Sequence, residues 1–239
     1  METREFFRRY SWVYCYAVSL CLVLAAGISS GVTAVSSAQA LARTPVVILD
    51  AGHGGIDGGA VSCTGVPESR INLEIARRTE ALMRLLGYET VMTRQTEDSV
   101  ATEGETIRQQ KRSDLRNRVQ QIARYPGGTL LSIHQNQFAD SGFSGPQVFY
   151  ADTPGSQELA RNLQEQLTES LSPGNTRRCK RAEGVYLLKH VDCRAVLVEC
   201  GFLSNPREEA ALRSAAYQKK LACVLAGVLA QQMQTTGES

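Results

Sequence analysis

The chain lacks an excess of charge of either sign. Its 239 residues carry 26 Lys and Arg against 24 Asp and Glu, which gives a formal net charge of +2. This balance provides no strong field for holding a nucleic acid through counterion release, so no nucleic-acid partner is expected. Hydrophobic residues (43%) and charged residues (21%) occur in ordinary globular proportions, which excludes bulk disorder and a multi-span membrane protein.

A regular cysteine framework is also missing. Of the 7 cysteines, Cys15 and Cys21 lie in an apolar N-terminal run, and the others are odd in number and irregularly spaced. No C-x-x-C pair is present, which argues against a thiolate zinc site and against a disulfide scaffold. We expect one or two disulfides at most, with the remaining cysteines acting as small apolar filler.

The beginning of the chain has the pattern of a targeting segment. Arg4, Arg8 and Arg9 precede residues 10–42, which contain no charged side chain and are mostly apolar. Residues 36–40 supply the small-x-small pattern that signal peptidases cut, which favours a cleaved signal over a permanent span. In either case the segment contacts the membrane and the following domain is exported.

We therefore divide the chain into residues 1–40, a signal peptide or N-terminal membrane anchor, and residues 41–239, a catalytic domain. The second part has the length of one ordinary domain. It contains no internal repeat, and its turn-rich stretches are short enough to be loops.

The exported part alternates strand and helix patterns. Short apolar runs between turn residues predict strands, and apolar positions at helical spacing predict helices. The expected strands are 45–50, 88–93, 129–134, 147–150 and 195–199, and the expected helices are 67–86, 115–124, 156–171 and one or two within 206–232. Strands separated by helices predict an α/β fold with a mostly parallel sheet and helices on both faces.

Polar residues follow three of these strands. His53, His134 and Glu199 stand at or just beyond strand ends, and ligands of such folds gather at the carboxyl ends of parallel strands. A hydrolytic zinc site needs three His or carboxylate ligands and an open position for water. His53, His134 and one carboxylate could supply these ligands. Glu68 is a candidate because the first turn of its helix can face back toward the strand ends.

Each candidate also has an ordinary structural interpretation. His53 could be a turn residue in its glycine-rich loop, and Glu68 could be a favourable charge at a helix start. Glu199 is harder to explain without a function, because a carboxylate in an apolar strand is costly unless it is paired or used. His190 has no comparable setting and is expected to be a surface or loop histidine.

Four ordered motifs then resemble a known family, the zinc-dependent N-acetylmuramoyl-L-alanine amidases of type 3. They are ILDAGHGG (48–55), Glu68 ahead of a helix containing Asn72-Leu73, SIHQN (132–136) and VECGFLSN (198–205). The resemblance covers about residues 45–233. It implies a twisted mixed sheet and a Zn²⁺ ion held by His53, Glu68 and His134. It also implies that Glu199 is the catalytic carboxylate, which passes a proton from water to the departing amine of L-alanine.

The motifs look most like those of germination-specific amidases from endospore formers. That resemblance implies a peptidoglycan substrate in spore cortex, muramic lactam formation, and a location on the extracytoplasmic face of the membrane or in the intermembrane or cortex space. Some family members carry a blocking helix between the third and fourth motifs, and residues 135–146 leave no room for one before the next strand. An accessory activating protein is therefore a possible partner.

Two other functions stay open on the sequence alone. One is another zinc hydrolase with a similar site, such as a peptidoglycan carboxypeptidase. The other is a non-catalytic wall-binding protein that keeps the fold, against which the intact set His53, Glu68, His134 and Glu199 argues.

Overall fold

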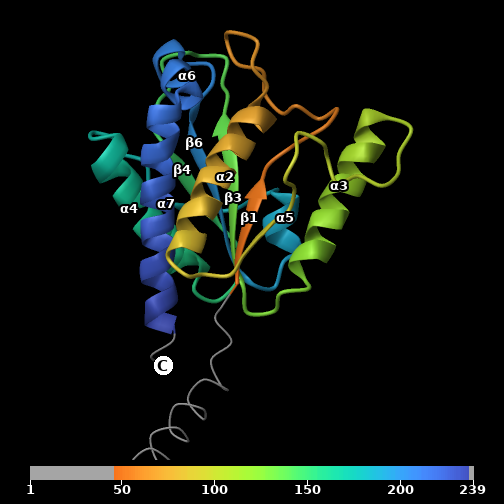
Figure 1. Ribbon diagram of the computed structural model, residues 1–239. Helices are drawn as coiled ribbons and strands as arrows, with labels where there is room; N and C mark the ends of the chain where they lie inside the picture. The colour runs from red at the N-terminus through yellow and green to blue at the C-terminus, as the bar shows by residue number, and fades with distance from the viewer. Residues whose placement is uncertain (1–45, 237–239) are drawn as a thin grey trace, which may run out of the picture. The chain divides into compact units, whose positions relative to one another are not determined.

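The computed structural model describes residues 46–236 (Figure 1). The predicted targeting segment, residues 1–40, and its boundary with the domain lie outside these residues. Within the described part, no helix combines the length and the apolar character needed to cross a membrane.

A six-stranded sheet forms the centre of the described domain, in the order β2-β1-β3-β6-β4-β5 (Figure 1). The strands are β1 (Val47–Ala51), β2 (Thr90–Met92), β3 (Thr129–Asn136), β4 (Gln147–Tyr150), β5 (Lys180–Arg181) and β6 (Arg194–Phe202). The pairs among β2, β1, β3 and β6 are parallel, whereas β4 runs antiparallel to β6. The predicted mostly parallel, mixed sheet is confirmed.

Helices cover both faces of this sheet, as the sequence predicted. They are α2 (Glu68–Leu85), α3 (Ile107–Ile122), α4 (Ser156–Leu171), α5 (Tyr186–His190), α6 (Pro206–Arg213) and α7 (Ala215–Thr236). α2, α4 and α7 contribute to the larger apolar core on one face, and α3 and α5 to a smaller core on the other. Successive side chains of β6 alternate between these two cores: Val196 and Val198 lie in the larger core, and Leu197 lies in the smaller. Glu199, two residues beyond Leu197, points to the α3/α5 face.

The structure differs from the predicted elements in three places, of which the first is β5, a two-residue strand that lies in a stretch with no predicted element. α3 begins at Ile107 rather than near residue 115, because Thr106 and Gln109 form a capping box in which each side chain accepts the other's backbone N–H. α5 was not predicted, since five residues are too few to show a helical period. His190 ends α5, exposed and stacked on Tyr186, in agreement with its predicted surface position.

The cysteines of the described part form no disulfide. Cys63, Cys179, Cys193, Cys200 and Cys223 are all free, and Cys193 and Cys200 are buried. The expectation that most cysteines act as apolar filler therefore holds for these two.

The core that supports the site can be tested at Leu131, a β3 residue that is 0% exposed. We predict that Leu131→Ala lowers the free energy of unfolding by about 2–5 kcal/mol, because it removes buried methyl groups and leaves a cavity. Equilibrium urea unfolding measures this change. Leu85→Ala is the matched control, since Leu85 is 82% exposed and should change stability by less than about 0.5 kcal/mol. An equal decrease in the free energy of unfolding in the two variants would contradict the placement of Leu131 in the core.

Candidate active site

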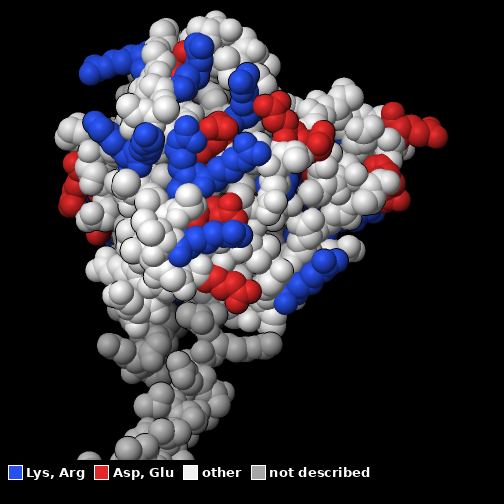
Figure 2. All heavy atoms as spheres, viewed as in Figure 1, with Lys and Arg blue, Asp and Glu red and all other residues white. Residues whose placement is uncertain are grey.

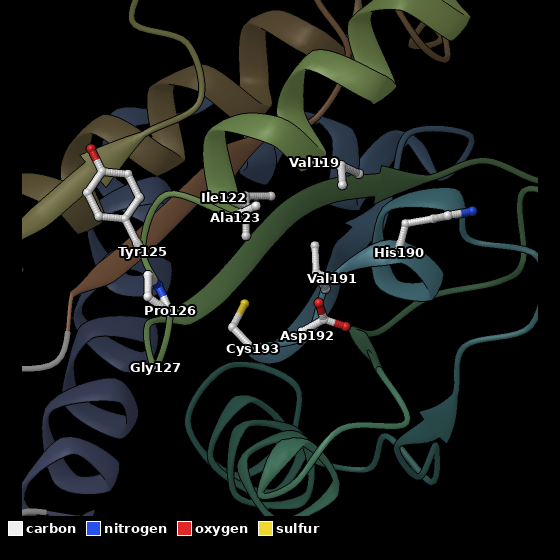
Figure 3. Close-up of a pocket in the computed structure, with 10 residues that line it drawn as sticks. All are labelled: Val119, Ile122, Ala123, Tyr125, Pro126, Gly127, His190, Val191, Asp192 and Cys193. Atoms are coloured by element: carbon white, nitrogen blue, oxygen red, sulfur yellow. The ribbon is translucent and has the colours of Figure 1, made fainter.

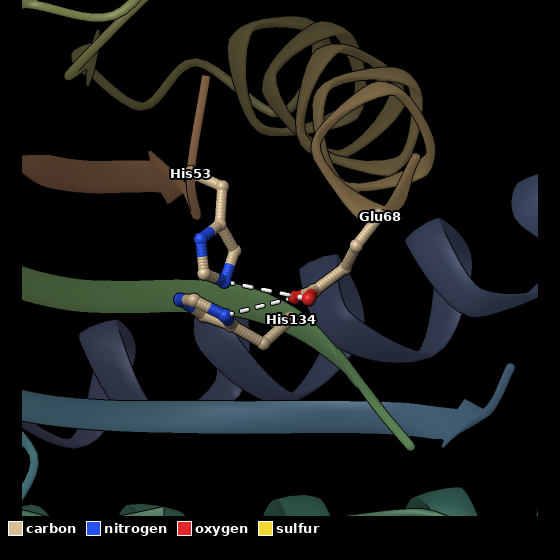
Figure 4. A group of neighbouring side chains, drawn as sticks. All are labelled: His53, Glu68 and His134. Carbon is tan, nitrogen blue, oxygen red and sulfur yellow. Dashed lines mark hydrogen bonds and ion pairs between the residues drawn. The ribbon is translucent and has the colours of Figure 1, made fainter. Parts of the chain in front are cut away.

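Three side chains from distant parts of the chain converge at the carboxyl ends of β1 and β3. His53 follows β1, Glu68 opens α2 and His134 lies near the end of β3 (Figure 4). The His53 Nε2 atom lies 3.3 Å from one Glu68 carboxylate oxygen, and the His134 Nδ1 atom lies 3.0 Å from the other. Each of the three residues offers one ligand atom, and these three atoms all lie within 4.8 Å of one another. This spacing could hold a metal ion.

His53 is oriented by Asp57. The Nδ1 atom of His53 lies 3.0 Å from the Asp57 carboxylate, so Nδ1 carries the proton and Nε2 is left to face Glu68. The hydrogen bond from His53 holds the pKa of Asp57 well below its usual range, and Lys111, 3.1 Å away, adds to the effect against the opposing cost of burial. A carboxylate behind a histidine is the usual way in which a ligating ring is fixed.

Glu68 is buried and has its oxygens fully engaged. Beyond the two histidines, its carboxylate accepts hydrogen bonds from the backbone N–H groups of Ala60 and Gln135 and from the side chain of Asn72. Burial raises the pKa of Glu68, but the hydrogen bond and charge of His134, with the charge of His53, outweigh it and lower the pKa to about 2. This carboxylate is therefore held ionised.

The ring of His134 packs against the backbone of Gly52, which has no side chain. A Cβ atom on Gly52 would lie 2.2 Å from the Cε1 and Nε2 atoms of the His134 ring, so only glycine fits there. Burial lowers the pKa of His134, but its hydrogen bond to Glu68 and the charges of Glu68 and Glu199 raise it above the ordinary value overall.

Glu199 lies beside this group but belongs to none of its contacts. It pairs in register with His134 across the parallel β3 and β6 strands, so the two side chains project from the same face. Its Oε2 atom is buried and has no hydrogen-bond partner among the described residues. Burial raises the pKa of Glu199 to about 7, helped by the charge of Glu68 and opposed by that of His134. A carboxyl group with this pKa can both accept and donate a proton near neutral pH.

Two buried arginines that sequence reasoning missed hold the loop of His53. Arg94 donates to the carbonyl oxygens of Ala51 (2.8 Å) and Gly52 (3.0 Å). Arg118, from α3, donates to those of Ala51 (2.8 Å) and His53 (2.7 Å). His53 adopts a left-handed backbone conformation with φ of 61°, which is unfavourable for a residue with a side chain. These hydrogen bonds keep it there.

The side chain of Arg118 also forms a buried ion pair. It lies 2.6 Å from Asp50 and 2.7 Å from Asp114, and Asp50 accepts further hydrogen bonds from Thr93 and Ser132. Burial raises the pKa of Asp50, but the charge of Arg118 and these hydrogen bonds lower it to about 2. The pair links β1 to α3 directly behind the site.

A cavity of about 330 Å³ opens onto the site from the α3/α5 face. It is lined by His53, His134 and Glu199 and, toward its rim, by Lys111 and Tyr186. A second cavity, of about 170 Å³, lies between α3 and the segment before β6, next to Ile122 and Cys193 (Figure 3). Cys193 directly precedes β6, so this cavity is at the amino ends of the strands, away from Glu199.

The visible surface carries no field of one sign. Figure 2 shows Lys and Arg interspersed with Asp and Glu over the face that it presents. This intermixing agrees with the near-neutral composition and provides no basic platform for nucleic acid on that face.

The family model described as N-acetylmuramoyl-L-alanine amidase matches residues 47–230. The chain belongs to this family. The resemblance inferred from the four motifs and the predicted enzyme class, a peptidoglycan amidase, are thereby confirmed.

Individual relatives agree with the family. The germination-specific N-acetylmuramoyl-L-alanine amidase of Bacillus subtilis is 37% identical over 74% of this chain and 75% of the relative. LytC of the same organism is 29% identical over 75% of this chain but only 34% of its own length. The CwlD amidase of Clostridioides difficile, solved in complex with the GerS lipoprotein, is 35% identical, with a TM-score of 0.77 over 80% of this chain and 99% of that one.

The Asp50–Arg118 pair predicts a specific dependence of stability on pH. The pKa of Asp50 in the folded chain, about 2, lies below its ordinary 3.8, so its contribution is complete above about pH 4 and is lost as the pH falls toward 2. We predict that Asp50→Asn lowers the free energy of unfolding by about 3 kcal/mol at pH 7, because it leaves Arg118 without one of its buried partners. The difference in free energy of unfolding between this variant and the wild type should become smaller by about 2 kcal/mol as the pH falls from 4 to 2.

Urea unfolding at several pH values measures this gap. Asp192→Asn is the control, since Asp192 is exposed and the variant should follow the wild type throughout. A gap for Asp50→Asn that stays constant down to pH 2 would contradict the ionised, paired state of Asp50.

Proposed function

We propose that this amidase is zinc-dependent and hydrolyses the amide bond between the lactyl group of N-acetylmuramic acid and L-alanine of the stem peptide. One observation carries the proposal: His53, Glu68 and His134 offer ligand atoms within 4.8 Å of one another, and beside them lies Glu199, whose Oε2 atom has no hydrogen-bond partner among residues 46–236. The family supports the reaction, and the donor set supports the metal.

The donors fit a zinc ion. Two imidazoles and one carboxylate form a standard catalytic ligand set, which leaves a position open for water or substrate. Glu68 is ionised, and Asp57 fixes the proton of His53 on the nitrogen that faces away from the group. When bound, the metal would polarise the scissile carbonyl and lower the pKa of the attacking water.

The remaining chemistry falls to Glu199. Its free oxygen lies on the same face as His134, where it can take a proton from the attacking water. The same carboxyl can then give this proton to the departing amine of L-alanine. Its burial, which raises its pKa to about 7, suits a group that must do both. The cavity of about 330 Å³ beside it gives a substrate access to this oxygen.

We further propose that the substrate is spore cortex and that the product feeds muramic lactam formation. The name of the Bacillus subtilis relative supports the link to germination. We place the enzyme outside the cytoplasmic membrane, with residues 1–40 directing export and contacting the membrane. The complex of the C. difficile relative with a lipoprotein supports an accessory protein partner for this chain as well.

The reaction can be tested by product analysis. We predict that the purified protein, supplied with zinc and tested with and without a candidate accessory lipoprotein, releases whole stem peptides with a new N-terminal alanine from peptidoglycan. Mass spectrometry of the digest identifies these products. Release of single C-terminal amino acids would instead identify a carboxypeptidase, and no release under any condition would favour a non-catalytic wall-binding role.

The division of roles between the proposed metal ligands and Glu199 predicts different effects for two variants. Glu199→Gln should bind zinc normally yet lose turnover by about 10²-fold or more, because the amide cannot carry the proton. His134→Ala should lose most of its metal affinity, since it removes one of three ligands.

Zinc content after dialysis, measured beside turnover, separates the two variants. Circular dichroism spectra that match the wild type verify that each is folded. Loss of zinc from Glu199→Gln, or full zinc content in His134→Ala, would overturn the role assigned to that residue.

A further inference from the structure

Arg177 lies on the far side of Glu199 from the proposed metal ligands. His134, Glu199 and Gln147 form one row across the sheet, since Glu199 pairs in register with His134 on β3 and with Gln147 on β4. Residues paired in this way project from the same face. The Arg177 guanidinium lies 3.4 Å from the Gln147 side-chain oxygen, so it continues the row by one further side chain.

Within residues 46–236, the hydrogen bonds and ring contacts of this guanidinium are all to neutral groups. Its other hydrogen bond is to the carbonyl oxygen of Ser144, also at 3.4 Å, and both bonds are long. It lies over two aromatic rings, with its central carbon 5.0 Å from the Phe202 centroid and 5.9 Å from that of Phe143. A guanidinium has five N–H donors, so this one retains capacity for an anion. Arg118, in contrast, has two carboxylate partners.

The aromatic groups beside Arg177 form a partly open, ordered surface. Phe138 and Phe143 are 45% and 42% exposed and meet edge to face, 5.1 Å between centroids. The backbone N–H groups of Gly145 and Phe202 both donate to the Glu208 carboxylate at 2.8 Å, which holds the loop against the end of β6. The surface therefore combines a fixed cation with exposed apolar area.

The proposed reaction determines which part of the substrate passes this surface. Glu199 gives its proton to the departing amine, so the amine lies next to Glu199 and the stem peptide continues from there. Neighbouring strands are about 4.8 Å apart, and an extended peptide advances about 3.3 Å per residue. A peptide that leaves Glu199 in the direction of β4 therefore brings its second residue near Arg177.

We propose that Arg177 binds a free carboxylate on the second residue of the stem peptide, and so makes the enzyme selective for acidic over amidated stem peptides. This inference rests on the proposed amidase reaction. Arg177 would act as a specificity residue, since a charge-assisted hydrogen bond forms with a carboxylate but not with a carboxamide.

Paired substrates test this inference. One is a muramoyl peptide with a free carboxylate on its second residue, and the other carries a carboxamide there. The wild type should cleave the acidic substrate with a kcat/KM about tenfold higher, the effect of one hydrogen bond to a charged group. Arg177→Gln should lose about this factor on the acidic substrate, mainly through KM, and show equal kcat/KM values for the two.

Two further variants make the test specific. Arg177→Lys keeps the charge and should retain part of the preference, because an ammonium group binds a carboxylate without the two-pronged geometry of arginine. Arg178→Gln is the matched control, since its exposed neighbouring side chain should leave the preference unchanged.

The outcomes separate this inference from the proposed function. A wild-type enzyme that cleaves both substrates equally well would overturn the inference while leaving the amidase reaction intact. An equal loss on both substrates in Arg177→Gln would likewise overturn it, since the residue would then act on the fold or the glycan rather than on the carboxylate. Cleavage of neither substrate by the zinc-loaded wild type, either alone or with the accessory lipoprotein, would instead reject the proposed function.

Discussion

The geometry of the site depends on the hydrogen bonds that arginine side chains donate to a short stretch of backbone. The carbonyl oxygens of Ala51, Gly52 and His53 are held by Arg94 and Arg118. A left-handed residue with a side chain costs about 1–2 kcal/mol, and His53 is such a residue. The hydrogen bonds from the arginines offset this cost and so help to hold the imidazole toward Glu68. Because Arg118 belongs to α3, the placement of His53 depends on a helix that supplies no member of the His53, Glu68 and His134 group.

The sequence could predict the converging side chains but not this support. His53, Glu68 and His134 stand at a glycine-rich loop, a helix start and a strand end, and all three places meet at one edge of a parallel sheet. Arg118 gives no such signal, because α3 is rich in Arg, Lys and Gln, and an arginine in such a helix is normally exposed. Asp114, four residues earlier in the same helix, is a local partner that does not by itself predict burial. The burial of Arg118 is decided by Asp50 on β1, whose contact with it exists only in the folded chain.

The mixed sheet also has a physical cause that the strand pattern alone does not reveal. β3 and β4 are joined by residues 137–146, which contain no helix. Two parallel strands need a connection of a dozen or more residues, usually a helix, which returns the chain to the end of the sheet where the first strand began. The short loop instead lets the chain enter β4 at the end of the sheet where β3 finishes. β4 therefore runs antiparallel to β6. This reversal places Gln147, the first residue of β4, opposite Glu199 near the end of β6.

The two acids beside His134 illustrate how environment supports different roles for one side-chain type. Glu68 is more buried than Glu199, yet its oxygens accept hydrogen bonds from backbone and side-chain donors, and the nearby imidazoles favour its charge. Glu199 has an oxygen for which the described part of the chain provides no partner, and burial therefore raises its pKa to about 7. Two carboxyl groups whose pKa values are separated in this way are suited to opposite tasks. A permanently ionised acid can hold a cation, whereas an acid near neutrality can move a proton. This separation of the two pKa values supports the proposed roles, with Glu68 as the ligand and Glu199 as the proton carrier, rather than the reverse.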